Sequence, residues 1–287
     1  MPVTITDVNR LRRAQSEVVR LAQGELQKLW FELSDLPPER LRDALLDLLP
    51  ALIGRYSEVG GTAAVEWYER VRAYYFSDDF DGRIYSGDRE LTEADRLEEE
   101  DLRRLIRWKA GVLWDSPDSK ANPDELYEWL DNMLDSRIRN TARDTIRGNA
   151  RHDPRRPRYA RVSNPGCCAF CALMSSRGYV YGSEDSASFA NSRSFHRTPK
   201  TGKETCRCEI VPEFKKGDNR IEGYDPARLE RLYRDAYDRI ADGKLPDDWL
   251  EDMKAKGIST ERPTDPNTIT YVMRRMHPDE YGDGVTR

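Results

Sequence analysis

All five cysteines of this 287-residue chain lie in two short segments, and no other feature restricts the fold as strongly. The first segment, CCAFCALMSSRG, begins at Cys167, and the second, TCRCEIVPEF, holds Cys206 and Cys208. Clustered cysteines in a chain that folds in a reducing compartment are typical of metal ligands rather than of disulfides. The pattern therefore predicts a small cross-linked module within residues 159–214.

The spacing of these cysteines suits a tetrahedral zinc ion. Cys168 and Cys171 form a CxxC turn that directs two thiolates at one ion, and Cys206 and Cys208 form a CxC pair that can supply two more. Four thiolates at ~2.3 Å from zinc would leave no open position, with His196 as the rival fourth ligand. We expect the metal to be structural, because a module of about fifty-five residues with few large apolar side chains often needs a cross-link.

Two other interpretations of the cysteines stay open. Reduced cysteines can pack in a core as small hydrophobic residues without binding any metal. Alternatively, disulfides can form once the protein leaves the cell, and the odd number of cysteines would then leave one thiol over.

The remainder of the chain has the periodicity of helices. Apolar residues recur at intervals of three and four across Thr6–Leu33, and Pro37 and Pro38 end that helix. We expect a second helix over Glu39–Tyr56, a break at the glycine pair 60–61, and a third helix that begins at Thr62. Further helices are predicted over residues 92–108, 124–150, 226–240 and 266–276, with a polar loop over 77–90 and no strand before residue 150.

These patterns predict a mainly α protein with a small α+β cysteine-rich, zinc-binding module. We expect three domains: a helical domain over 1–150, an Arg/Pro-rich linker with the metal-binding module over 151–216, and a C-terminal helical tail over 217–287. The start of the chain, MPVTITDVNRLRRAQ, has no apolar core of the kind that a secretory signal needs. No window approaches the ~18 apolar residues of a membrane span, so we expect folding in a cytoplasm and no membrane partner.

Charge is distributed unevenly along the chain. The net charge of -5 argues against a generally basic coat for nucleic acid, yet Arg137–Arg161 holds nine arginines and two aspartates, a local charge of +7. Part of this set recurs at every fourth position, as expected for one face of a helix. The candidate contacts to an acidic partner or to phosphates are Arg139, Arg143, Arg147, Arg151, Arg155, Arg156 and Arg158. The alternative is a solvated helix face whose basic end suits the helix dipole.

An enzyme is the main rival interpretation. The chain has three histidines, and His196 could pair with Cys167, Ser175 or Ser176 as a nucleophile–base pair. The sequence contains no GxSxG, no HExxH and no glycine-rich phosphate loop, and a closed zinc site would occupy the thiols. We therefore expect no catalytic residue, with a thiol or serine hydrolase as the alternative.

The stretch CAFCALMSSRGYVY followed by CRCEIVP resembles the Mu F-like minor head, or head-morphogenesis, proteins of tailed phages, in the version found in phages of actinobacteria. The resemblance extends to NTARDTIRGNARHDP, YARV and RDALLDLLPALIGRYSEVGGTAAVEWYERVRA, and more weakly to RRMHPD. It implies a minor capsid protein of few copies at the portal or inner shell of the virion, made in the host cytoplasm. Its implied partners are the portal protein, the major capsid or scaffold protein, and packaged DNA; a capsid maturation protease is the enzyme that the family suggests.

The sequence departs from that family's pattern in one respect. In the family, a histidine stands within a few residues of the CxC pair, whereas His196 stands ten residues before Cys206. An inserted segment could keep His196 in the same site or remove it from the metal.

Overall fold

The computed structural model describes residues 2–87, 89–92, 100–179, 208–215 and 221–281. The chain divides into two compact units, one formed by Asn9–Arg156 and the other by Met1–Val8 with Pro157–Arg287. The described part of the chain is mainly helical, as the periodicity predicts. Within those ranges, no helix combines the length and apolar character that crossing a membrane requires.

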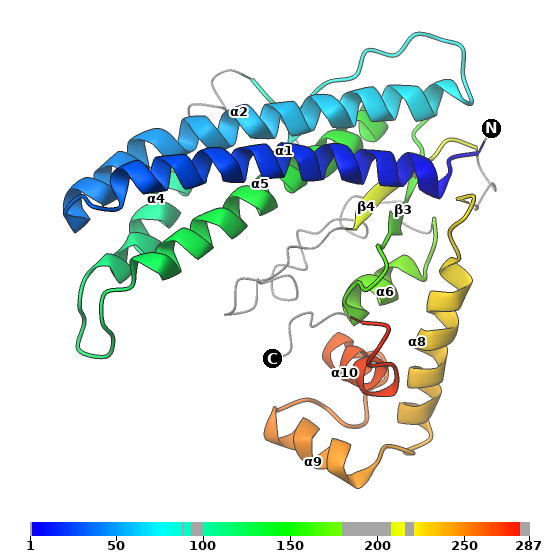
Figure 1. Ribbon diagram of the computed structural model, residues 1–287. Helices are drawn as coiled ribbons and strands as arrows, with labels where there is room; N and C mark the ends of the chain where they lie inside the picture. The colour runs from blue at the N-terminus through cyan, green and yellow to red at the C-terminus, as the bar shows by residue number, and fades with distance from the viewer. Residues whose placement is uncertain (1, 88, 93–99, 180–207, 216–220, 282–287) are drawn as a thin grey trace. The chain divides into compact units, whose positions relative to one another are not determined.

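Three long helices build the unit Asn9–Arg156 (Figure 1). They are α1 (Ile5–Leu33), α2 (Pro38–Ala73) and α5 (Pro123–His152). The short helix α4 (Glu100–Lys109) and a 3-10 turn (Ala110–Leu113) pack on the same core. That core is aliphatic, and its buried members include Leu26, Leu41, Leu45, Leu49, Ile53, Ile106, Leu126, Leu130, Leu134 and Ile138. The apolar stripes seen in the sequence therefore face one another.

The predicted break at Gly60 and Gly61 is wrong, because α2 runs unbroken through both glycines. A Cβ at Gly61 would lie 2.5 Å from Cγ2 of Ile84, and one at Gly60 would lie 3.1 Å from Cγ2 of Ile138. The glycines therefore serve close packing rather than a turn. The hydroxyl of Thr62 donates to the carbonyl of Glu58 at 3.0 Å, a bond made inside a helix, so Thr62 is not an N-cap.

The loop predicted over 77–90 contains a small hairpin, β1 (Tyr85–Ser86) paired with β2 (Arg89–Glu90). Asn149 of α5 holds the loop by its backbone: its Oδ1 accepts from the N–H of Arg83 at 2.9 Å, and its Nδ2 donates to the Arg83 carbonyl at 2.7 Å. The expectation of no strand before residue 150 is thus wrong. Strands of two residues are too short to show an alternating pattern.

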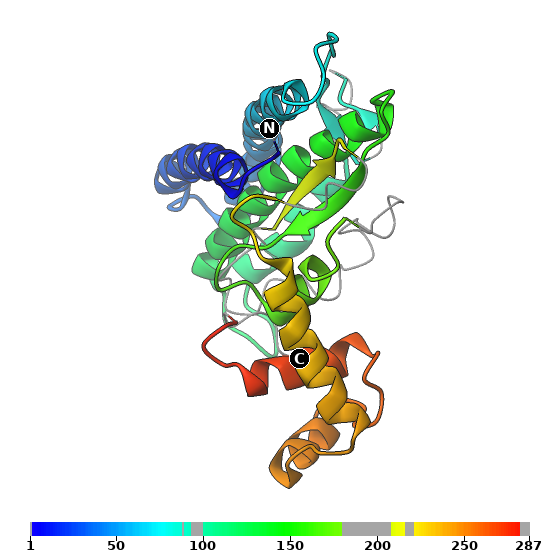
Figure 2. The same ribbon diagram turned by 90° about the vertical axis from the view of Figure 1, so that its right-hand side faces the viewer.

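In its described residues, the second unit joins a two-stranded sheet to four helices. Strand β3 (Arg158–Val162) pairs antiparallel with β4 (Glu209–Glu213), with Ala160 opposite Val211. The helices are α6 (Ala169–Ser175), α8 (Pro226–Ala241), α9 (Asp247–Ala255) and α10 (Pro266–Met276), and α10 lies across α8 (Figure 2). The helices predicted over 226–240 and 266–276 are confirmed.

The cysteine-bearing helix α6 shares one core with the C-terminal helices. Its residues Ala169, Ala172 and Leu173 pack with buried side chains of the tail, namely Ala236, Ile240, Leu245, Met253, Ile269, Val272 and Met273. The first residues of the chain also belong here, because the N–H of Ile5 donates to the Glu222 carbonyl at 2.7 Å and the N–H of Glu222 donates to Val3 at 3.0 Å. The cysteine segment thus obtains its core from sequence-distant residues of its own unit.

Candidate functional site

The CxxC turn lies at the start of α6. Cys168 is the N-cap residue, and its Sγ accepts a hydrogen bond from the backbone N–H of Cys171 at 3.4 Å. Cys171 itself is 2% exposed. Two thiols held in one turn, one of them already an acceptor of an N–H donor, fit one half of a tetrahedral zinc site.

The other predicted ligands are divided between described and undescribed residues. Cys208 immediately precedes β4, is fully buried, and lies near the phenol of Tyr224. Cys206 and His196 lie outside the described residues. Across the described ranges, no three His, Cys, Asp or Glu side chains form a ready-made metal group. Three of the predicted ligands, Cys168, Cys171 and Cys208, are thus described without forming such a group, and the full set of zinc ligands stays a prediction.

Two residues of the C-terminal tail, Arg274 and Tyr281, lie near the cysteines at the start of α6. Burial lowers the pKa of the Arg274 guanidinium on α10, against the opposing effect of the nearby Cys168 thiol. The phenol of Tyr281 interacts with the Cys167 thiol, and a backbone bridge joins Gly166 to Tyr281. A cation and a phenol thus stand beside the thiols, and neither was among the residues predicted for the site.

Three of the arginines predicted to contact a partner are buried. Arg139 is 2% exposed; its Nε donates to Oδ1 of Asp135 at 2.6 Å and its Nη2 to Oγ of Ser16 at 3.3 Å. Arg143 and Arg147 are buried as well, and Arg147 pairs with Asp144 at 2.9 Å. The expected exposed stripe along α5 is therefore corrected: these guanidiniums hold neighbouring side chains instead of facing solvent.

The other four predicted arginines, Arg151, Arg155, Arg156 and Arg158, are exposed. The guanidinium of Arg155 lies 4.4 Å from the ring centre of Phe76, and that of Arg158 pairs with Glu213 at 2.8 Å. The exposed basic surface is thus the segment where α5 ends and β3 begins, residues 151–158.

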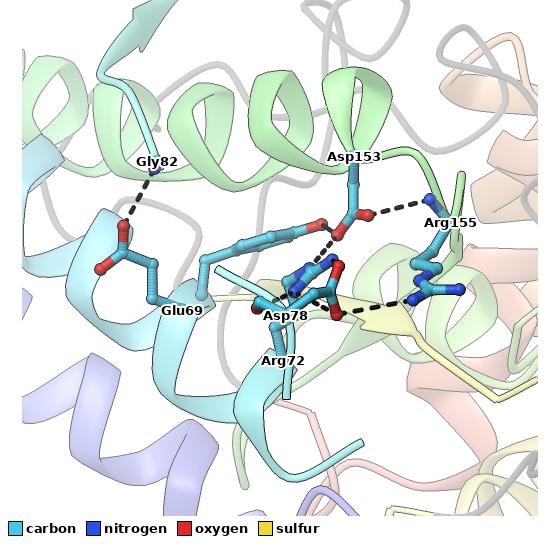
Figure 3. Close-up of polar contacts among 7 residues, drawn as sticks. Glu69, Arg72, Asp78, Gly82, Asp153 and Arg155 are labelled. Atoms are coloured by element: carbon cyan, nitrogen blue, oxygen red, sulfur yellow. Dashed lines mark hydrogen bonds and ion pairs between the residues drawn. The ribbon is translucent and has the colours of Figure 1, made fainter. Parts of the chain in front are cut away.

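A buried ion-pair network anchors the start of that segment (Figure 3). Nε of Arg72 and the hydroxyl of Tyr68 both donate to Oδ2 of Asp153, at 2.8 and 3.0 Å. Nη2 of Arg72 also donates to Asp78 at 2.8 Å, and the backbone N–H of Arg155 donates to Oδ1 of Asp153 at 2.9 Å. Burial alone would lower the pKa of the Arg72 guanidinium, but the hydrogen bonds to Asp78 and Asp153 outweigh burial and raise it. No local sequence pattern predicts this network, because Asp153 stands 81 positions after Arg72 in the chain.

The loop beside the network is held just as closely. Oε1 of Glu69 accepts from the N–H of Gly82 at 2.9 Å (Figure 3). A Cβ at Gly82 would lie 2.6 Å from Cγ1 of Val65. The backbone of the loop after α2 therefore lies against the side chains of Glu69 and Val65, and a larger residue at position 82 would disturb these contacts.

A family model described as VG15 protein matches residues 2–236. The chain belongs to the VG15 family. VG15 is a family of phage gene proteins, which agrees with a phage protein as the resemblance implied. No curated protein and no solved structure matches this VG15 chain.

The VG15 match includes both cysteine segments, the arginine-rich segment and the network around Arg72. Helices α9 and α10 follow the last matched residue. The core around α6 therefore combines residues inside the matched range 2–236 with residues of α9 and α10 that follow it.

Proposed function

We propose that this VG15 chain is a minor capsid protein of the Mu F-like, head-morphogenesis type, acting in assembly of a tailed-phage head. The observation that carries the proposal is the match to a phage family over most of the chain, together with the CAFC and CRC segments of the resemblance. We propose that it resides in few copies at the portal vertex or inner capsid surface, after synthesis in the host cytoplasm.

We further propose a structural rather than a catalytic role. Ser175, one of the candidate nucleophiles, is fully buried near the end of α6, which does not suit attack on a substrate. Cys168 and Cys171 begin a helix whose apolar side chains enter the core of the unit. The first observation argues against Ser175 as a nucleophile, and the second supports thiols that serve the fold.

The proposed cofactor is one zinc ion held by Cys168 and Cys171 with Cys206 and Cys208, or with His196 in place of one cysteine. When bound, the ion would cross-link the start of α6 to the segment that leads into β4. Because such a site does not exist in an unfolded chain, the binding free energy would add directly to the stability of this unit. Elemental analysis of the wild-type protein and of a Cys206→Ser/Cys208→Ser variant tests this: one zinc per chain is expected, lost in the variant.

The proposed contact surface is the exposed basic segment 151–158. Arg155 and Arg156 follow the anchored Asp153, so their backbone positions are held while their side chains remain exposed. A rigid basic segment suits an acidic face of a portal, capsid or scaffold protein, or the phosphates of packaged DNA.

The test of the assembly role is a phage that carries a nonsense mutation in this gene, with and without complementation. We expect few normal heads by electron microscopy without complementation, and the protein in purified particles by mass spectrometry. Normal, infectious particles that lack the protein would overturn the proposal. Heads of normal shape with an uncleaved capsid protein would instead support the protease alternative.

A further inference from the structure

A groove runs between α1 and α2 on the surface of the unit Asn9–Arg156. Its volume is about 520 Å³, and all its lining residues belong to this one unit. The two helices run antiparallel (Figure 1), and Nη2 of Arg55 pairs with Oε1 of Glu25 at 2.5 Å from one helix to the other. Between the charged side chains the groove is apolar, and its apolar lining consists of Leu29, Leu48, Ala51 and Leu52.

Exposed apolar side chains extend this groove. The described residues expose six large hydrophobic side chains, and four of the six belong to α1 and α2, namely Leu21, Phe31, Leu48 and Val59. Leu21 stands one turn before Glu25 on α1. Val59 stands one turn after Arg55 on α2, so these two apolar residues continue the groove beyond the ion pair. A contiguous apolar strip bordered by charges is typical of a surface that another protein covers.

The charges along the groove are complementary to a second copy of the same surface. Two carboxylates, Glu25 and Glu32, and two cations, Lys28 and Arg55, line it, so the charge of the groove sums to zero although the whole chain carries -5. Two such surfaces can meet without net repulsion. Because Glu25 and Arg55 pair within one copy, the acid on α1 and the base on α2 stand at the same level along the groove.

We propose that a second copy of this chain docks on the groove, with α1 of each copy over α2 of the other. A twofold axis parallel to the helices produces this arrangement, in which every contact occurs twice. Glu25 of each copy then faces Arg55 of the other, and Leu21 faces Val59. Neither the zinc site nor the role in head assembly is needed for this pairing.

The size of the apolar strip indicates how strongly two copies associate. From Leu48 to Val59 the strip extends about 17 Å, and two helices side by side are about 20 Å wide, so roughly 350 Å² of each copy would be covered. Stable dimers of standard size cover about 800 Å² per partner. We therefore expect a weak and reversible dimer, with a Kd on the order of 10–100 µM.

Analytical ultracentrifugation of the full-length protein tests the pairing. The concentration runs from about 5 to 500 µM, which spans the expected Kd, and a reductant prevents disulfides between chains. Leu48→Asp should weaken the dimer at least about tenfold, because the change enters a symmetric interface twice. The matched control is Leu105→Asp: Leu105 is also an exposed leucine but lies on α4, outside the groove, so wild-type association is expected.

Charge reversal tests which side chains meet between the two copies. Glu25→Arg places cations alone at this level of the groove, and Arg55→Glu places carboxylates alone there, so each variant should stay monomeric by itself. An equimolar mixture of the two variants should form a mixed dimer, because every contact between the copies then joins opposite charges. A variant that is only weakened in its own fold would not be rescued by mixing.

Three results would overturn the proposal. A wild-type chain that stays monomeric at every concentration would leave the groove to a helix of another protein. A dimer that Leu48→Asp and Leu105→Asp affect equally would show that the copies associate through a different surface. Charge variants that dimerise alone, or that do not pair on mixing, would show that Glu25 and Arg55 do not meet between copies.

Discussion

Nε of Arg72 donates to Oδ2 of Asp153 at 2.8 Å, and the two side chains are 2% and 0% exposed. Removing one member of a buried ion pair leaves an uncompensated charge, which costs about 3–5 kcal/mol. We therefore expect Asp153→Asn to lower the free energy of unfolding by roughly that amount. The matched control is Asp78→Asn, since Asp78 pairs with the same guanidinium but is 46% exposed; its loss should cost about 1 kcal/mol or less. Equal losses in urea unfolding would contradict the assignment of the buried pair as the dominant contact.

Gly148 packs against the ring of Tyr85, so that an added Cβ would overlap ring carbons. Gly148→Ala should destabilise the protein by about 1–3 kcal/mol through overpacking. Gly24 also lies inside a long helix but has nothing within 4 Å of its Cβ position, so Gly24→Ala should stabilise by about 0.5–1 kcal/mol. Thermal unfolding of the two variants should therefore shift in opposite directions, and a gain for both would contradict the close packing at Tyr85.

Asp252 joins α9 to α10. It accepts hydrogen bonds from Lys256 at 2.8 Å, Tyr271 at 2.6 Å and Arg275 at 3.0 Å, and these bonds hold its pKa far below the ordinary value. A carboxylate whose folded pKa is depressed stabilises the fold above its unfolded pKa, about 3.9, and the contribution is lost as pH falls below it. We expect Asp252→Asn to lower the melting temperature at pH 7 and the difference from wild type to shrink below about pH 4. The control is Asp235→Asn, which changes an exposed aspartate of α8. A loss of melting temperature in Asp252→Asn that stays the same at every pH would contradict the electrostatic cause.

Arg139 and Arg156 should respond to substitution in different ways. Arg139→Met leaves the largely buried Asp135 without its ion pair, so it should destabilise the helical unit, by about 3–5 kcal/mol if Asp135 stays buried. Arg156→Gln should leave stability within about 0.5 kcal/mol of wild type and weaken binding to an acidic partner, with a smaller salt dependence. Unfolding curves and binding measured across salt concentrations distinguish the two effects. Weaker binding in Arg139→Met without loss of stability would restore Arg139 to the contact surface.

Removing the metal should affect the two units differently. We expect a strong chelator to raise hydrogen exchange in β3, α6 and β4 while α2 and α5 keep their protection, because only the cysteine-bearing unit would lose a cross-link. The Cys208→Ser variant should show the same exchange pattern without any chelator. Uniform loss of protection in both units would indicate that the metal serves the whole chain, and no change at all would count against a structural ion.

The sequence predicts the long helices well because their signals are local. Apolar residues at intervals of three and four define α1, and Asn122 before Pro123 marks the start of α5, where the Asn122 side chain accepts from Glu125 at 3.2 Å. The continuity of α2 could not be predicted in this way. In the sequence alone, two adjacent glycines indicate the end of a helix. The reason for them is the close approach of Ile138 to Gly60 and of Ile84 to Gly61, and both isoleucines are distant in the sequence.

In the candidate site, too, the local features could be predicted and the long-range contacts could not. The CxxC turn is local and could be read directly, whereas its surroundings come from residues 274–281, more than a hundred positions later. For the arginines, a helical repeat shows which side chains share a face but not whether that face is covered. One local signal was available: Asp135 stands four residues before Arg139, and Asp144 three before Arg147, the spacing of ion pairs within a helix.

The pairing of Val3 and Ile5 with Glu222 has a consequence for biosynthesis. Every residue of the unit Asn9–Arg156 has been translated while the partner of the chain's first residues is still unmade. At about 5–20 residues per second, the ribosome needs several more seconds to reach Glu222. The helical unit can thus complete its contacts on the nascent chain, while Val3 and Ile5, which are made before it, still wait for Glu222.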